Sequence, residues 1–377
     1  MTPLTNTHIH TNYSFSVFDS PAQAVNQAVK ENIKILGIND HYTVDGHDEF
    51  AKECSAKKIC PMFSMEAVAV DRHCLDNGKR FNDPNNPGRF YFTAKSVTKK
   101  LLPNSYGFNA LQTMRKSLTE RNEKLVENLN NHLKNIGENF SISMREVENL
   151  TPTGNTTERH VVQILAEKII ETGGNRAGEI VEKLCGSFPD NLNDPATFQN
   201  FLRGKLIKAG CPDYAPELPD AFLSIEDMRA LYLEMGAVPL YPVLGNPITE
   251  MEENFDDLIC FLAQKNIFAL EVIPNRNSRE RLLAVVNAAK NAKIPIVTGT
   301  EHNTKTPGSL IDQFSEEEPF RTVFFENALV LLGHRVAVLN GETGYVDAKG
   351  NLRFDDREKG LEYFKNLGRN FFEQSTF

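Results

Sequence analysis

Residues 33–46, IKILGINDHYTVDG, contain the clearest evidence for the fold. An apolar, β-branched run of strand length ends directly on the polar residues NDH, which is typical of a buried strand reaching the edge of its sheet. Ser20 and Pro21 begin the preceding helix, because serine caps helices and proline suits their first turn. A first strand is expected at residues 4–10. This order of strand, helix and strand predicts parallel βα units and an α/β fold.

The same alternation continues along the chain and returns after a long interruption. A helix beginning at Asp45 is followed by two more strand-like runs, and three later helices have the capping residues Ser224, Asn254 and Ser278. In total the pattern indicates about seven βα-like units. The further strands are expected at residues 61–70, 88–95, 237–244, 268–273 and 294–299.

Residues 112–223 interrupt the alternation, since they contain helical patterns without a strand signal. They predict an inserted, mostly helical subdomain between two βα segments, residues 1–111 and 224–305. Residues 306–377 predict a C-terminal extension made of a helix, a β-hairpin turning at Lys349 and an amphipathic last helix. Within this extension the apolar run LVLLGHRVAVLNG suggests a strand.

Composition narrows the classes of function. The 41 Lys and Arg residues against 50 Asp and Glu give a net charge of -9, which disfavours binding along an extended nucleic acid. No run approaches the roughly 18 apolar residues that span a bilayer, and the N-terminus lacks the apolar core of a secretion signal. The six cysteines include no C-x-x-C pair, so neither a zinc ribbon nor a disulfide framework is predicted. We expect reduced thiols and a cytoplasmic protein.

His8 and His10 stand two residues apart on the first expected strand. Side chains alternate along a strand, so both imidazoles point to one face and together can bind one ion. Two surface histidines on an edge strand would give the same pattern, so the surroundings decide. His41 ends the second strand, and Glu66 stands alone among apolar residues of the third. Because barrel strands bring their carboxyl ends to one mouth and a buried carboxylate needs a partner, a metal site is predicted there.

These residues resemble the PHP family, which is named for polymerase and histidinol phosphatase. The segment TERHVVQILAEKII is similar to a helix of the branch that removes phosphates from nucleotides, and the match extends over about residues 4–305. The motifs that carry the resemblance are His8-x-His10, SFSVFD (14–19), GINDHYTVDG (37–46), Glu66, and the later blocks at 224–247, 269–275 and 297–303.

The resemblance implies a distorted seven-stranded (β/α) barrel of TIM-like form that holds one to three divalent ions, Mn, Zn or Fe. It also implies hydrolysis of phosphoesters by a metal-activated water. Carboxylate and imidazole groups suit these ions, and neighbouring ions can clamp a phosphate. The ligands that it implies are His8, His10, Glu66 and Glu301 for a first ion, Glu66 for a second, and Asp19 and His41 for a third.

Three positions depart from the family pattern. Tyr91 stands at or beside an expected histidine, Asn246 replaces the histidine of a His-Pro pair, and Asn303 ends a block that normally reads Asp-x-His. An amide oxygen is a weaker ligand than imidazole, so the first ion site is expected to be intact and the other two are in question. His302 is a candidate replacement if the strand end is shifted, and His73 is a weaker one.

Arg159 and His160 begin a predicted helix, where free N–H groups and the helix dipole favour anions. A guanidinium there could bind two phosphate oxygens, although a solvated arginine is an equally common alternative. Arg276, after the sixth strand, is a further candidate. We predict Arg159 and His160 as catalytic and substrate-binding residues and Arg276 as a substrate-binding residue.

The residues and the resemblance leave three functions open. The first is a metal-dependent phosphoesterase acting on a small phosphorylated metabolite such as a nucleotide. The second is a barrel whose metal site has decayed and which serves as a binding or regulatory module. The third is a single-metal lyase or amidohydrolase-like enzyme. Metal content separates the first from the second, and activity on unphosphorylated substrates alone would favour the third.

Overall fold

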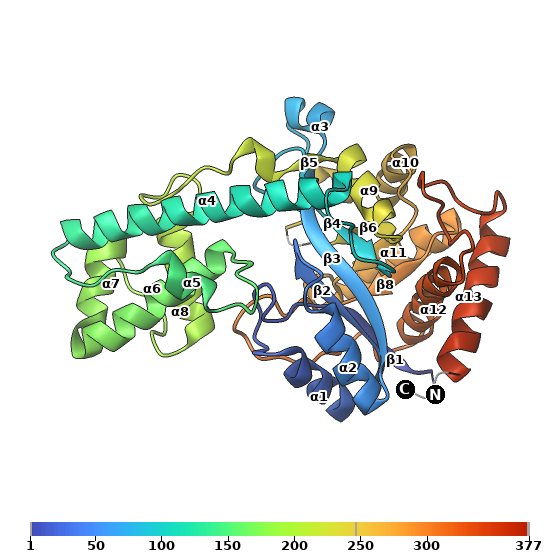
Figure 1. Cartoon of the computed structure of the whole chain (residues 1–377), viewed down its shortest axis with the longest axis horizontal. Helices are drawn as coiled ribbons and strands as arrows, with labels where there is room; N and C mark the ends of the chain where they lie inside the picture. Colours follow the sequence, from blue (N-terminus) through green and yellow to red (C-terminus); the bar gives the residue numbers. More distant parts are fainter. Residues whose placement is uncertain (1, 246, 375–377) are drawn as a thin grey trace.

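The computed structural model describes residues 2–245 and 247–374, and its sheet forms a nearly closed barrel. Seven strands follow one another in the order β1-β2-β3-β4-β6-β7-β8, while β5 pairs with β3 outside this path (Figure 1). The distorted seven-stranded barrel expected from the sequence is confirmed. The strands are β1 (Leu4–Ile9), β2 (Ile33–His41), β3 (Cys60–Val70), β4 (Arg89–Lys95), β5 (Leu223–Ser224), β6 (Val238–Val243), β7 (Leu270–Val272) and β8 (Ile296–Thr298).

The first strand meets the segment that follows the last one. Glu301, three residues beyond the end of β8, forms a parallel bridge with Ile9. The backbone N–H of His10 donates to the carbonyl of Glu301 at 2.7 Å, and the N–H of Glu301 donates to the carbonyl of His8 at 2.9 Å. Closure therefore brings the predicted ligands His8 and His10 next to Glu301.

Strand β4 is antiparallel to both of its neighbours, β3 and β6. The expectation of parallel units throughout is therefore wrong at this strand. The reason is local: the segment between β3 and β4 contains only the five-residue helix α3, which is too short for a crossover connection. The reversal sets Lys95, the last residue of β4, opposite Val238 at the start of β6.

Most helices begin where their capping residues predict. The helix expected from Asp45 starts two residues later, at His47. Four predicted caps accept hydrogen bonds from first-turn N–H groups: Ser20, Ser224, Asn254 and Ser278. The α-helices are α1 (Pro21–Lys30), α2 (His47–Lys57), α3 (Arg72–Asp76), α4 (Tyr106–Asn135), α5 (Met144–Glu148), α6 (Glu158–Gly173), α7 (Ala177–Cys185), α8 (Pro195–Leu202), α9 (Ile225–Glu234), α10 (Phe255–Gln264), α11 (Arg279–Ala292), α12 (Phe320–Leu339) and α13 (Arg357–Gln374).

The inserted helices extend away from the barrel. Helix α4 is 30 residues long and runs outward, and α5 to α8 pack beneath its far half (Figure 1). They bury an apolar cluster of their own, which includes Leu129, Leu165 and Ile180. A π-helical turn, Arg203–Ile207, follows α8. The short strand β5 then returns the chain to the sheet beside β3.

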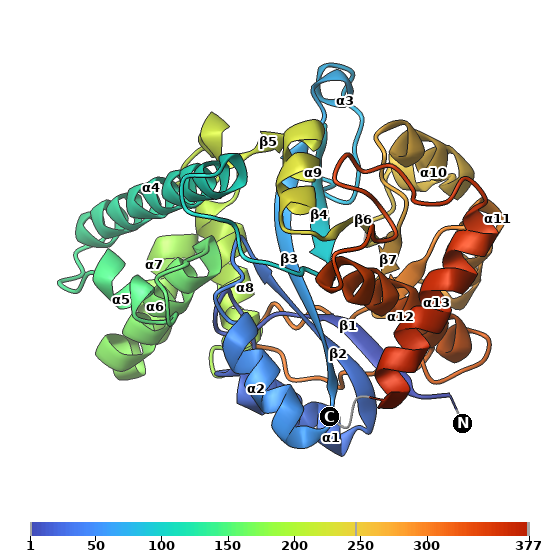
Figure 2. The same cartoon turned by 45° about the vertical axis from the view of Figure 1, so that its right-hand side comes forward.

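The amino-terminal end of the barrel interior, which we call the base, is covered by α12. Leu329 of this helix belongs to the same buried cluster as Ile35, Met62 and Val297 from the strands. Helix α13 packs alongside α12 (Figure 2). Helix α12 is long and apolar enough to cross a membrane, yet more than half of its apolar stretch is buried within the protein. Its apolarity is therefore explained by its place in the core.

The extension corrects one sequence prediction. The strand suggested for residues 329–341 is wrong, because this run is the second half of α12. A helix buried on several sides lacks the polar face that gives a helical pattern its periodicity. The predicted hairpin is reduced to a tight turn with a single antiparallel bridge between Val346 and Leu352, whereas the last helix is confirmed as α13.

Candidate metal centre

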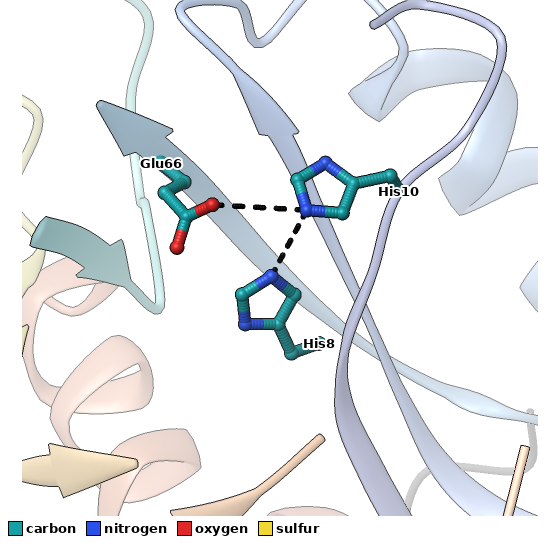
Figure 3. Close-up of side chains that lie close together, drawn as sticks. All are labelled: His8, His10 and Glu66. Carbon is teal, nitrogen blue, oxygen red and sulfur yellow. Dashed lines mark hydrogen bonds and ion pairs between the residues drawn. The ribbon is translucent and has the colours of Figure 1, made fainter. Parts of the chain in front are cut away.

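The opening strand and the residue directly after it carry two imidazoles into the barrel interior. His8 and His10 are both fully buried, and the alternation of side chains along the strand turns them to the same side. Their Nε2 atoms lie 3.1 Å apart (Figure 3). One ion next to this pair could therefore contact both nitrogens.

The next two strands add an acid and a third imidazole at the same mouth. Glu66 lies on β3, and its Oε2 is 3.7 Å from His10 Nε2 (Figure 3). His41 ends β2, and its Nδ1 lies 3.3 Å from the same carboxylate oxygen. The ligand atoms of His8, His10 and Glu66 all lie within 4.8 Å of one another. We call these three residues the ligand cluster.

Hydrogen bonds define which nitrogen of each imidazole carries its proton. His8 Nδ1 lies 2.7 Å from Glu271 Oε2, which accepts, so this nitrogen is the donor. The amide nitrogen of Asn39 approaches His8 Nε2 at 2.8 Å. A donor at this position requires a lone pair on the nitrogen. The Nε2 atom of His8 therefore carries the lone pair that a metal ion needs, and an ion bound there would displace the Asn39 amide.

Hydrogen bonds fix the tautomer of His10 in the same way. The hydroxyl of Ser14 donates to Asp40 at 2.6 Å and therefore accepts from His10 Nδ1, which lies 3.3 Å away. The Nε2 atom of His10 then also carries a lone pair. Two lone pairs that face each other at 3.1 Å repel, and a cation beside them turns this repulsion into attraction.

Burial controls the charges of the cluster. Burial raises the pKa of Glu66 well above its usual value, and the carboxylates of Glu301 and Glu271 raise it further. Burial lowers the pKa of His10 well below its usual value, with His41 and His8 adding to the effect. Burial also lowers the pKa of His41 to about 3. The imidazoles of His10 and His41 are therefore neutral near pH 7, and Glu66 must lose its proton before its carboxylate can bind an ion.

This donor set fits a divalent transition ion. Two imidazole nitrogens and one carboxylate are the ligands that Zn, Mn and Fe share in proteins. Three protein ligands also leave positions open for water and substrate, as in catalytic centres. The residues that would hold the ion are those of the ligand cluster, and His41 stands beside it.

The side chains of Glu301 and His302 have partners other than the ligand cluster. The backbone of Glu301 pairs with β1, but its carboxylate is ion-paired with Arg276 and accepts from Asn303 at 3.3 Å. The ring of His302 is hydrogen-bonded to Thr300 and to the carbonyl of Gly308. His302 therefore contacts its own loop, and it is not part of the ligand cluster of His8, His10 and Glu66.

Asp19 also lies outside the ligand cluster. Its side chain is 84% exposed and faces Lys305 at 3.9 Å. The segment after β1 buries Ser14, Phe15, Ser16 and Phe18 instead, so it turns Asp19 outward. A loop has no regular side-chain alternation, so the sequence did not show that Asp19 points away from the ligand cluster.

Arg159 and His160 begin α6 as predicted, but their roles differ. His160 Nδ1 accepts from the N–H of Thr157 at 2.9 Å in a capping box, and its ring lies edge-on to Phe15. The ring also bonds the backbone of Ser14, and burial lowers its pKa to about 3. The guanidinium of Arg159 lies 5.8 Å from the Phe15 ring centroid and donates to Asn200. His160 thus connects the insertion to the loop after β1 through Phe15. Arg159 lies beside this contact, near the same ring.

Two of the three positions that depart from the family pattern, Tyr91 and Asn303, lie at or near the mouth. The ring of Tyr91 lies 6.2 Å from that of His41, and burial raises the pKa of its phenol. Asn303 contacts Glu301. His73 lies on the exposed helix α3, where it bonds Asn77, and so takes no part in the cluster. Asn246 lies outside the described residues.

Sequence reasoning missed two charged residues beneath the cluster. Glu271 on β7 and Lys95 on β4 are fully buried and form an ion pair at 2.7 Å. Burial alone would raise the pKa of Glu271, but Lys95 and His8 outweigh it and lower that pKa to about 2. The signal that identified Glu66, a lone charge in an apolar strand, applies equally to both residues and could have found them.

The fold and the site together define a barrel protein with a candidate divalent-metal centre at the carboxyl ends of its strands. The chain belongs to the PHP family: the model of the PHP domain matches residues 6–208. No curated protein matches the chain. Family membership and the ligand cluster support a metal-dependent hydrolase.

Two of the solved structures that match the chain show the same fold. One is a protein from Bifidobacterium adolescentis that is provisionally named a metal-dependent phosphoesterase; it is 17% identical, the alignment covers 86% of this chain and 96% of that chain, and the TM-score is 0.56. The other is an amidohydrolase from Chromobacterium violaceum with bound sulfate and no metal; it is 14% identical, with 81% and 89% covered and a TM-score of 0.55.

Proposed function

We propose that the chain hydrolyses a phosphate ester of a small metabolite, and we favour a nucleotide as the substrate class. The observation that carries this proposal is the pair of imidazole lone pairs that converge beside Glu66. A bound Mn, Zn or Fe ion would supply Lewis acidity and activate a water molecule. The provisional name of the Bifidobacterium adolescentis protein supports the phosphoester class.

The chain's own cations would bind the phosphate. Arg159 contributes a positive field that lowers the pKa of both His10 and His41, so its charge is felt at the cluster. Arg276 adds a second guanidinium beside Glu301. Two fixed cations near the ion can hold phosphoryl oxygens and stabilise the charge that develops on them. His160 would act indirectly, by fixing the start of the helix that carries Arg159.

A cavity beside Arg276 and Glu301 supports a small substrate. Its volume is about 590 Å³, and the segments after β7 and β8 line it with mostly polar side chains. That size suits a metabolite rather than a polymer. The net charge of -9 also favours a small substrate over an extended nucleic acid.

All six cysteines are free, which supports a reducing, cytoplasmic location.

A catalytically inactive module is the second candidate. Two observations favour it: the carboxylate of Glu301 is already paired with Arg276, and Tyr91 stands where an imidazole was expected. Both features reduce the number of groups available to further ions. Elemental analysis of protein purified without chelator separates the candidates, because an enzyme with this centre retains at least one transition ion per chain.

Turnover tests the proposal directly. The Mn-loaded protein would be assayed against phosphomonoesters, short oligonucleotides, and unphosphorylated esters and amides. We expect turnover of small phosphomonoesters and its loss in His8→Ala. The matched control is His73→Ala, which removes an exposed histidine outside the cluster and should leave turnover unchanged. Undiminished turnover in His8→Ala, or turnover of unphosphorylated substrates alone, would contradict the proposal.

A further inference from the structure

Three strands on different sides of the barrel contribute to one buried polar contact. Glu271 of β7 accepts two contacts. Its Oε2 accepts from His8 Nδ1 at 2.7 Å, and its Oε1 accepts from the ammonium of Lys95 at 2.7 Å. All three side chains are fully buried. Lys95 also donates to the carbonyl of Thr7 at 2.6 Å, and the hydroxyl of Thr7 donates to Glu271 Oε1 at 3.1 Å. Every oxygen of this carboxylate therefore has a partner.

Such a pair is a poor way to stabilise a barrel. Removing two charges from water costs roughly several kcal/mol for each ion. Apolar residues of similar volume often stabilise a protein interior equally well or better. Apolar side chains do fill the interior just below, where Met62, Leu240 and Val297 pack against α12. The charged pair thus calls for a role other than stability.

Its geometry supplies that role, because Glu271 contacts the nitrogen of His8 that faces away from the ligand cluster. An acceptor at Nδ1 keeps the proton there and leaves the lone pair on Nε2, 3.1 Å from His10 Nε2. Carboxylates behind metal-bound imidazoles fix the ring and its tautomer in this way. Lys95 holds Oε1, so Oε2 remains directed at His8.

We propose that the Lys95–Glu271 pair is a positioning device that holds the His8 ring with its Nε2 directed at the metal ion. This inference rests on the metal centre of the proposed function. Lys95 and Glu271 are positioning residues, since neither contacts the ligand cluster's open side. The arrangement separates two properties that usually change together: removing the pair weakens metal binding without weakening the fold.

The test measures metal affinity and stability in the same variants. Glu271→Leu combined with Lys95→Met replaces both charges with apolar groups of similar size. We expect Zn affinity, from competition with a chelator, to fall by roughly 10- to 100-fold, while the thermal midpoint of the metal-free protein stays level or rises. Glu271→Gln, which keeps an acceptor near His8, should show a smaller loss of affinity.

A matched control comes from the insertion. Asp213 accepts from His132 Nδ1 at 2.8 Å, which is the same carboxylate–imidazole contact far from the ligand cluster. Asp213→Asn should leave Zn affinity unchanged. A second readout needs no metal: nitrogen NMR of histidine-labelled protein should report the Nδ1–H form of His8 in the wild type and lose this preference in the double variant.

The outcomes distinguish the two proposals. If the wild type binds no divalent ion, the metal centre of the proposed function fails and this inference fails with it. If the wild type binds Zn and the double variant binds it equally well with the same His8 tautomer, only the positioning role is overturned. Reduced affinity together with an intact thermal midpoint supports it.

Discussion

Buried histidines stand at both ends of the barrel, and their partners differ. At the base, His334 of α12 has a partner for each nitrogen: Nε2 donates to the carbonyl of Gly236 at 3.1 Å and Nδ1 accepts from the N–H of Tyr345 at 2.9 Å. At the mouth, His8 and His10 direct their Nε2 atoms at each other. Burial alone therefore does not identify a ligand; the convergence of two imidazole nitrogens on a carboxylate does. The mouth is organised for binding and the base for stability.

The largest effect is expected at the mouth. Glu66→Gln removes the acidic ligand. Losing a residue that only hydrogen-bonds a metal ligand already lowers metal affinity by about 10- to 100-fold, so losing the ligand itself should lower it by about 100-fold or more. The metal-free protein should not lose stability, since the raised pKa of Glu66 means that its ionised form is disfavoured where it lies. Calorimetric titration with Mn and thermal melts of the metal-free protein measure the two properties. A large loss of stability with unchanged metal affinity would show that Glu66 stabilises the fold and does not bind the ion.

At the base, a single methyl group should cost stability without affecting the metal centre. A Cβ on Gly333 of α12 would lie 1.9 Å from the carbonyl oxygen of Phe364 on α13. Gly333→Ala should therefore destabilise the fold by about 1–3 kcal/mol, the usual cost of overpacking. Gly178→Ala is the control, because its nearest neighbour would be at an ordinary 3.5 Å. Urea unfolding gives the free energies, and equal values for the two variants would contradict the close packing of α12 on α13.

The histidine at the base should make stability depend on pH. Burial lowers the pKa of His334 to about 4 in the folded state, whereas the unfolded chain titrates near the usual value of about 6.5. The unfolded state thus takes up a proton first as the pH falls, so stability is lost from about pH 6.5 downward.

His334→Gln isolates this contribution. The variant should be less stable at pH 7, yet lose about 1–2 kcal/mol less than the wild type between pH 7 and pH 5. Denaturant unfolding at both pH values supplies the comparison. Parallel stability curves for the two proteins would show that His334 is not the titrating group.

The smallest effect should come from adding a ligand at the mouth. Tyr91→His introduces an imidazole near His41, whose ring is now 6.2 Å from that of Tyr91. We expect a modest rise in bound Mn per chain at saturating metal, with no change in Tyr91→Phe. Unchanged metal content in Tyr91→His would indicate that other features of the second half of the barrel limit the number of ions.

Local patterns predicted the parts of the molecule that depend on neighbouring residues. Ser224 and Asn254 cap their helices, and the strands bearing His8 and Glu66 follow from short apolar runs. The expected proximity of these two side chains needed one non-local assumption, that strand ends meet at one mouth. The barrel meets that assumption.

The failures arise where distant residues decide. Helix α12 is buried on several sides, so it carries no amphipathic pattern and resembled a strand. The outward direction of Asp19 depends on which neighbours in its loop are buried. Lys95 and Glu271 are 176 residues apart in sequence, and their pairing with His8 follows only from the closed barrel.

Anomalous diffraction from crystals soaked in Mn or Zn shows whether the ligand cluster binds a divalent ion. We expect one strong peak beside His8 and His10, with both Nε2 atoms and a carboxylate oxygen of Glu66 at about 2.0–2.2 Å from the ion. A mouth without a peak at saturating metal, or an ion bound elsewhere while these three side chains keep their present contacts, would contradict this prediction.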